Sequence, residues 1–379
     1  MGYLRLETFS RLIMASSLNV SLETNGVIIQ DPEVEMIDQL VTTIAQAGVR
    51  ADRIDVVDFY VALKHRPMAI LAGPVGSGKT ALVSCLANFL ESSDSLSRKV
   101  VSGHAWYAGG SRGPASTVLI DMHARMITEK LLSILEEASQ LENAQQVFVV
   151  GLTHISPTEL RSFFAEVAFQ IQHHRIMRLG EAHLSSPVLF PPNLLLIGTM
   201  DTAKFDWWDE DLLSGATVVE WPAEAVIPQA RIEGNLQNFG GMFMRSSVRS
   251  SRKAYGKLLS VMADARQPLQ AIMLFKNILQ AYGFEFSPTL FDEVILYLAN
   301  AWSQQGNGLF NPSPSDNLAI ASDLALAQLV LPQYLKMLRS SASLQEKLYA
   351  VLDERLPRSR TFLKRHCEEV PHPSSLKGI

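Results

Sequence analysis

Short apolar runs alternate with amphipathic stretches along the first part of the chain. The runs at 68–72, 146–151, 193–200 and 217–221 are nearly continuous in apolar residues, which is typical of strands buried on both faces of a parallel sheet. Before and between these runs, apolar residues recur every three or four positions, most clearly at 31–48, 52–65, 81–90, 118–140 and 160–171. That spacing predicts helices. The alternation predicts an α/β core with a parallel sheet flanked by helices.

The pattern changes in the second part of the chain. Between 223 and 251 the periodicity is lost and proline and glycine collect, as in a linker or a mobile insertion. Apolar positions then recur at helical spacing around 255–281, 288–303, 316–339 and 343–367, with no convincing strand. A second, all-helical unit is therefore expected after the α/β core.

A glycine-rich turn follows the first predicted strand without a gap. Residues 73–80 fit the pattern GxxxxGK followed by Ser or Thr, and a predicted helix begins directly after them. Glycines let successive N–H groups converge on a phosphate at a helix N-terminus. Lys79 is expected to reach the β and γ phosphates, and the Thr80 hydroxyl is expected to ligate Mg²⁺. The predicted binding residues are Gly73, Pro74, Val75, Gly76, Ser77, Gly78, Lys79, Thr80 and Ala81. The alternative is a purely structural glycine turn.

Composition limits the class of protein. The chain has 379 residues, of which 47% are hydrophobic and 19% charged, so it is long enough for two or three packed units. The net charge of -5 excludes a generally basic nucleic-acid binder, although not a local basic patch. The two cysteines, Cys85 and Cys367, lie far apart and favour a reducing, cytoplasmic setting. No apolar run reaches membrane-spanning length and no signal-peptide pattern is present, so a cytoplasmic protein without a membrane partner is expected.

Several segments together resemble the McrB-like AAA+ family, the motor subunits of restriction systems that act on modified DNA. The likeness extends from about Asp55 to Val370 and rests on the order and spacing of four segments, VFVVGLTHISPTELRSFF, FPPNLLLIGTMD, DLLSGATVVEWP and DLALAQLVLPQYLKMLRSS. It implies a P-loop NTPase core of the AAA+ type, followed by a small all-helical lid. The expected organisation is an N-terminal extension that is partly helical (1–50), the nucleotide-binding core (51–222), the linker or insertion (223–252), the lid (253–370) and a C-terminal tail (371–379).

The resemblance also implies cofactors and partners. ATP or GTP with Mg²⁺ would drive formation of a homo- or hetero-oligomeric ring in a bacterial defence system. A separately encoded nuclease is the implied partner, and DNA would be contacted through the complex. No motif that reads the base is visible, so the sequence leaves ATP and GTP as alternatives.

The positions that serve hydrolysis in this family have changed. Leu152 and Thr153 stand where the acidic pair that orders Mg²⁺ and water is expected, and Asp201 replaces the sensor asparagine. Ser214, Gly215 and Ala216 occupy the arginine-finger segment, and Thr289 falls near the place of the lid arginine. His154 could polarise a water molecule, and Asp201 could replace the missing acid. Weak or absent hydrolysis is expected, and no catalytic residue is assigned.

Two other functions remain alternatives. One is an active ATPase or GTPase motor that drives a DNA-processing or remodelling complex. The other is a pure interaction protein in which the loop is a structural relic. A local basic cluster could touch nucleic acid or an acidic partner, although a solvated linker face is the preferred explanation. It comprises Arg245, Arg249, Arg252, Lys253 and Lys257.

Overall fold

The computed structural model describes eight stretches of the chain. They are residues 31–46, 48–90, 134–152, 189–202, 216–221, 239–261, 266–352 and 356–368. The helix expected at 160–171 lies outside the described residues, as does most of the helix expected at 118–140. The described residues form two compact units, one between Pro32 and Ser247 and the other from Val248 onward together with Asp31.

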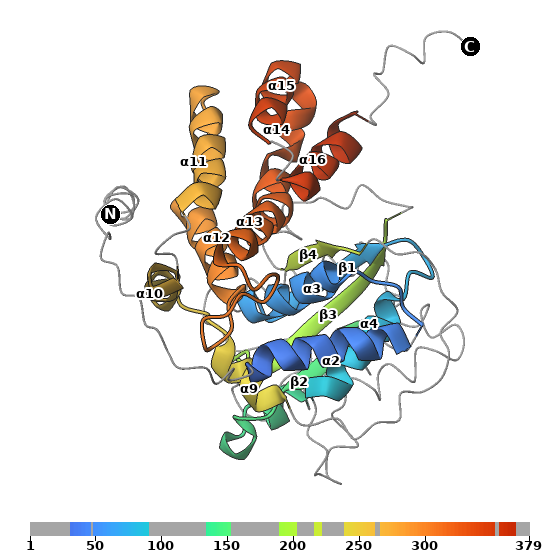
Figure 1. Cartoon of the computed structure of the whole chain (residues 1–379). Helices are drawn as coiled ribbons and strands as arrows, with labels where there is room; N and C mark the ends of the chain where they lie inside the picture. The colour runs from blue at the N-terminus through green and yellow to red at the C-terminus, as the bar shows by residue number, and fades with distance from the viewer. Residues whose placement is uncertain are drawn as a thin grey trace, which may run out of the picture. The chain divides into compact units, whose positions relative to one another are not determined.

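A four-stranded parallel sheet forms the centre of the first unit (Figure 1). Its strands are β1 (Met68–Gly73), β2 (Phe148–Leu152), β3 (Leu194–Asp201) and β4 (Thr217–Glu220). Their spatial order is β2-β3-β1-β4, so β1 is paired on both edges. All strand residues are buried except the last of β3 and of β4. The predicted α/β class with a parallel sheet is confirmed, and the apolar runs are explained because both faces are covered.

Helices flank this sheet. They are α2 (Pro32–Gln46), α3 (Arg53–His65), α4 (Lys79–Leu90) and the short α9 (Gly240–Ser246), with a 3₁₀ turn at Leu141–Asn143. Helix α3 contacts β1 and β4, whereas α4 contacts β2 and β3. Helix α2 packs on both α3 and α4 (Figure 1).

A buried polar network joins three of these helices. One carboxylate oxygen of Glu33 in α2 accepts hydrogen bonds from Lys64 Nζ at 2.7 Å and Tyr60 Oη at 3.0 Å, both in α3, and from Ser246 Oγ in α9 at 2.9 Å. Glu33 and Lys64 are almost completely buried. The Tyr60 ring also meets Phe243 of α9 edge to face, with centroids 5.4 Å apart. Helix α2, expected in the N-terminal extension, and α9, expected in the linker, are thus tied to the same unit as the sheet.

The second unit is helical in its described residues, apart from one isolated bridge between Trp302 and Gly308. Its α-helices are α10 (Ser251–Val261), α11 (Arg266–Ala281), α12 (Pro288–Asn300), α13 (Pro314–Ala325), α14 (Leu335–Ser340), α15 (Ala342–Val351) and α16 (Pro357–Leu363). The remaining turns are a π turn at Leu326–Val330, a 3₁₀ turn at Leu331–Tyr334 and a π turn at Lys364–Glu368. Serine side chains cap three of the helices, at Ser287, Ser313 and Ser341.

Buried polar side chains fix the connections within this unit. The Asp323 carboxylate of α13 accepts the N–H groups of Arg358 and Ser359, each at 2.8 Å, and so caps the first turn of α16. Burial raises the pKa of Asp323, although its hydrogen bonds with Ser359 oppose the shift. The Asp31 carboxylate accepts bonds from Ser303 and Asn307, which attaches the residue before α2 to the loop after α12.

The continuous helical stretch Pro314–Ser340 is long and apolar enough to cross a membrane by length and composition alone. Its most apolar window is 83% buried inside the protein, which is also the property of a core helix.

Candidate functional site

The predicted phosphate loop lies between a buried strand and a helix. Strand β1 ends at Gly73, the chain turns through Pro74–Gly78, and α4 begins at Lys79. Gly76 and Gly78 have φ angles of 80° and 81°, in the left-handed region that favours glycine. The tip of the turn is exposed, with Val75 at 75% of its full exposure, whereas the Ser77 and Lys79 side chains are buried beneath it.

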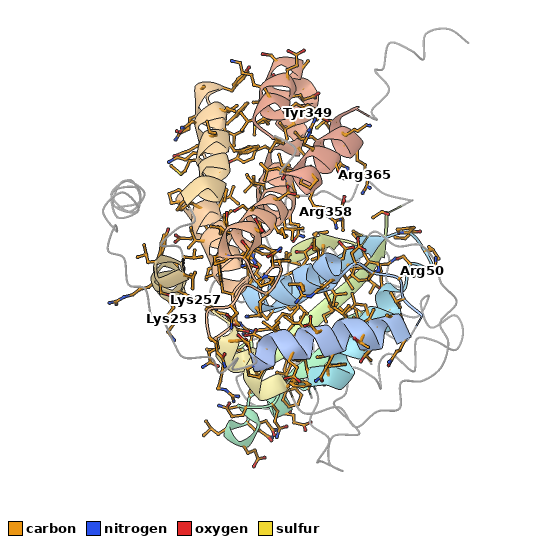
Figure 2. The ribbon with its side chains drawn as sticks, viewed as in Figure 1. Arg50, Lys253, Lys257, Tyr349, Arg358 and Arg365 are labelled. Atoms are coloured by element: carbon orange, nitrogen blue, oxygen red, sulfur yellow. The ribbon has the colours of Figure 1, made fainter. Side chains whose placement is uncertain are left out.

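Two glycines in the loop are also required by close neighbours. A Cβ atom on Gly73 would lie 2.5 Å from the Trp221 carbonyl oxygen, and one on Gly78 would lie 2.8 Å and 2.9 Å from the two γ carbons of Val49. Val49 belongs to the turn between α2 and α3 and is buried; Arg50, labelled in Figure 2, follows it. The loop is therefore held from two sides by segments that are distant in sequence.

Trp221, the residue after β4, supports the loop directly. Its indole Nε1 donates to the Ser77 carbonyl at 2.9 Å, and its backbone N–H donates to the Ala72 carbonyl at 2.7 Å. The side chain is completely enclosed. The sequence predicted Trp221 as part of the last strand but not as a support of the loop. The available signal was a tryptophan at the end of a strand, because a buried indole N–H needs a hydrogen-bond acceptor nearby.

The first turn of α4 directs backbone N–H groups toward the loop. The first four N–H groups of a helix have no partner within it, and the first helical bond of α4 runs from the Leu82 N–H to the Gly78 carbonyl at 2.9 Å. The N–H groups of Gly78 to Ala81 are the four that precede it. Together with the helix dipole, they favour an anion at this end of α4.

Lys79 folds back over the loop. Its ammonium group donates to the Gly73 carbonyl at 2.8 Å, the Pro74 carbonyl at 2.6 Å and the Ser77 hydroxyl at 3.1 Å. Burial lowers the pKa of Lys79, and the negative charge of Asp201 partly opposes that shift. A phosphate would face a desolvated cation here, and desolvation strengthens the attraction between the two charges.

The described carboxyl edge of the sheet has a carboxylate at the ends of β3 and β4 but an apolar residue at the end of β2. Asp201 ends β3 and Glu220 ends β4, and both are partly exposed. Leu152, one of the two residues that stand where an acidic pair is expected, is buried at the end of β2. The other residue, Thr153, lies outside the described residues, as does His154. In the part of the chain that the structure describes, no three His, Cys, Asp or Glu side chains are grouped to hold a metal ion.

This donor set still suits magnesium. Mg²⁺ is usually held by one or two carboxylates together with substrate phosphates and waters, and it prefers oxygen ligands. Thr80, in the first turn of α4, and Asp201 would supply such oxygens. The role of Thr80 as a Mg²⁺ ligand stays a prediction, and it is compatible with these donors.

The structure describes two of the four remaining predicted positions. Ser214 and Gly215 lie outside the described residues, and Ala216 is buried directly before β4. Thr289 is exposed in the first turn of α12.

The basic cluster is not a uniform solvated face. Burial lowers the pKa of Arg249 to about 10, and Lys257 donates to the Trp302 carbonyl at 2.7 Å. Arg252 and Lys253 are exposed on α10, the helix from which both labelled lysines project in Figure 2.

Comparisons with protein-family models, with curated proteins and with solved structures find no match to this chain.

Proposed function

We propose that the protein binds a purine nucleoside triphosphate, ATP or GTP, as its Mg²⁺ complex in the loop of Gly73–Ala81. The observation that carries this proposal is the position of the loop. It follows the carboxyl end of β1, which has a parallel neighbour on each side, and it opens the N-terminus of α4. Ligands of parallel α/β sheets bind outside the carboxyl ends of the strands, where successive connections leave in opposite directions. Here the chain passes from β3 on one side of β1 to β4 on the other.

In this proposal the chain is a P-loop NTPase of the AAA+ type, with the helical second unit as its lid. The fold class alone is compatible with many functions, so the proposal depends on the loop and on the resemblance to McrB-like proteins. That resemblance favours a nucleotide-dependent ring or mixed assembly in a bacterial defence system. A nucleotide that binds the assembled state more tightly shifts the population toward it without hydrolysis.

Weak hydrolysis is part of the proposal because of the residue that ends β2. Leu152 cannot order a metal ion or orient water, and its apolar side chain is buried at the carboxyl edge of the sheet. Of the two residues in place of the acidic pair, Leu152 and Thr153, only Leu152 lies in the described part of the chain. With leucine at this position, hydrolysis is expected to be slow unless a partner chain supplies the missing groups.

The proposal is tested by titrating the protein with fluorescent ATP and GTP analogues in Mg²⁺. Lys79→Ala should weaken binding by about 10- to 150-fold, the effect of losing a hydrogen bond to a charged group. Lys336→Ala is the matched control, because Lys336 is an exposed lysine on α14. Absence of binding by the wild-type protein, or an equal loss in both variants, would refute the proposal.

Phosphate release on the same samples separates the alternatives. Binding without release supports an assembly-forming protein, whereas release that disappears in Lys79→Ala supports the motor. Binding of neither nucleotide, with an unchanged melting temperature, supports the pure interaction protein.

A further inference from the structure

Asp201 is the carboxylate that the sheet places beside the loop. Strand β3 lies between β1 and β2, so it is the immediate neighbour of the strand that leads into the loop. The last residue of β3 is paired in register with the last residue of β1, Asp201 with Gly73. Neighbouring strands are separated by about 4.8 Å, so the two residues are adjacent.

The register also fixes the face on which Asp201 lies. A Cβ atom on Gly73 would lie 2.5 Å from the Trp221 carbonyl oxygen, 3.4 Å from the Trp221 Cβ and 3.5 Å from Ser77 Oγ, so it lies on the face of the sheet that the loop residue Ser77 approaches. Side chains of residues paired in register in a parallel sheet project from the same face. The Asp201 side chain therefore leaves the sheet on the loop side, which agrees with its electrostatic effect on Lys79.

Glu220 differs in this respect. It ends β4, on the other side of β1, and is paired with Ala72 rather than with Gly73. Because successive residues of a strand alternate between faces, Glu220 projects from the opposite face of the sheet. Two carboxylates of similar exposure thus flank β1, one on the loop side and one away from it.

A carboxylate beside a phosphate loop opposes binding of a bare triphosphate. Two like unit charges about 7 Å apart, in surroundings of intermediate polarity, repel each other enough to weaken binding by roughly 10- to 50-fold. A divalent cation between the carboxylate and the phosphates reverses the sign of this interaction. Mg²⁺ accepts carboxylate and phosphate oxygens as ligands together.

We infer that Asp201 is a specificity-determining residue that makes the loop select the divalent-cation complex of the nucleotide over the free anion. The inference rests on the proposed nucleotide binding and adds to it the reason for a carboxylate at this position. Lys79 and the N–H groups of α4 attract any phosphate, with or without a cation, whereas Asp201 penalises the form without one. The carboxylate does not need to take part in hydrolysis for this effect.

The test is the ratio of two dissociation constants for the same nucleotide, one measured in EDTA and one in Mg²⁺. In Asp201→Asn this ratio should fall by about 10- to 50-fold, mainly because binding in EDTA becomes tighter. Asp201→Glu retains the charge and should keep most of the ratio. Glu220→Gln is the matched control and should leave it unchanged.

The outcomes separate the two proposals. If the wild-type protein binds nucleotide in neither buffer, nucleotide binding itself is refuted. If it binds but Asp201→Asn leaves the ratio unchanged, or weakens binding equally in both buffers, Asp201 has only a structural role and the inference is overturned. If Asp201→Asn does not fold, Asp201→Ser provides the same removal of charge, and an unchanged ratio in that variant refutes the inference equally.

Discussion

Replacing Gly78 by alanine tests the close approach of Val49 to the loop. Two separate penalties are expected. The left-handed backbone conformation costs an alanine about 1–2 kcal/mol. The new Cβ would also lie 2.8 Å and 2.9 Å from the γ carbons of Val49, closer than real carbon atoms approach. Overpacking of this kind costs about 1–3 kcal/mol, so Gly78→Ala should destabilise the sheet unit by roughly 2–5 kcal/mol in total.

Two variants separate these penalties. Gly283 has a φ angle of 79° and no atom within 4 Å of its would-be Cβ, so Gly283→Ala should show the backbone penalty alone. Val49→Ala removes both γ carbons that the new Cβ would meet. In the double variant Val49→Ala with Gly78→Ala, about 1–3 kcal/mol of the overpacking penalty should therefore be recovered relative to the sum of the single effects.

Hydrogen exchange followed by mass spectrometry is the suitable assay, because a protein of two units does not unfold in one step. Peptides from α4 report the stability of the sheet unit, and peptides from α12 report the unit that contains Gly283. Each 1.4 kcal/mol corresponds to about a tenfold change in the exchange rate of the most protected amides. If the double variant is the simple sum of the single variants within about 0.5 kcal/mol, Val49 does not limit the space at Gly78 and the reasoning is refuted.

Three further predictions concern buried polar groups. Lys64→Met leaves the enclosed carboxylate of Glu33 without its cation and should lower the unfolding free energy by about 3–5 kcal/mol. Adding Glu33→Gln should recover part of this loss, and a double variant whose α3 amides exchange as fast as those of Lys64→Met would contradict the prediction. Trp221→Phe removes the indole donor to the loop carbonyl and should cost about 1–3 kcal/mol; unchanged exchange in α4 would contradict it. Because burial raises the pKa of Asp323 above its ordinary value of 3.8, the native form keeps a proton where the unfolded form has lost it. The unfolding free energy of the helical unit should therefore fall as pH rises through this range, and Asp323→Asn should remove that fall while Asp316→Asn, an exposed control on α13, retains it.

The elements that sequence reasoning located are those defined by local patterns. The apolar runs predicted as strands at 68–72, 146–151, 193–200 and 217–221 differ from the observed strands by one or two residues at their ends. The loop residues were likewise identified as a contiguous motif. In each case hydrophobicity, glycine and spacing act within a few residues, so the information lies in the segment itself.

The contacts that shape the site could not be predicted from local sequence patterns. The bond from Trp221 to the Ser77 carbonyl joins residues 144 positions apart, and the position of Asp201 beside Gly73 depends on the order of the strands. Helix α9 was also missed, because two glycines begin its seven residues and its stability comes from burial of Phe243 against other helices. No local pattern records such tertiary contacts.

The strand order has a consequence for how the chain is made. Both native partners of β1 come later in the sequence, and about 120 residues separate the end of β1 from the start of β3. At the usual rates of protein synthesis, roughly 6–24 s pass before the ribosome has produced the first strand that can pair with it. During this interval an apolar segment with two open edges is exposed on the nascent chain, a species prone to aggregation. Among the described strands, Met68–Gly73 is therefore the one that waits longest for a partner during synthesis.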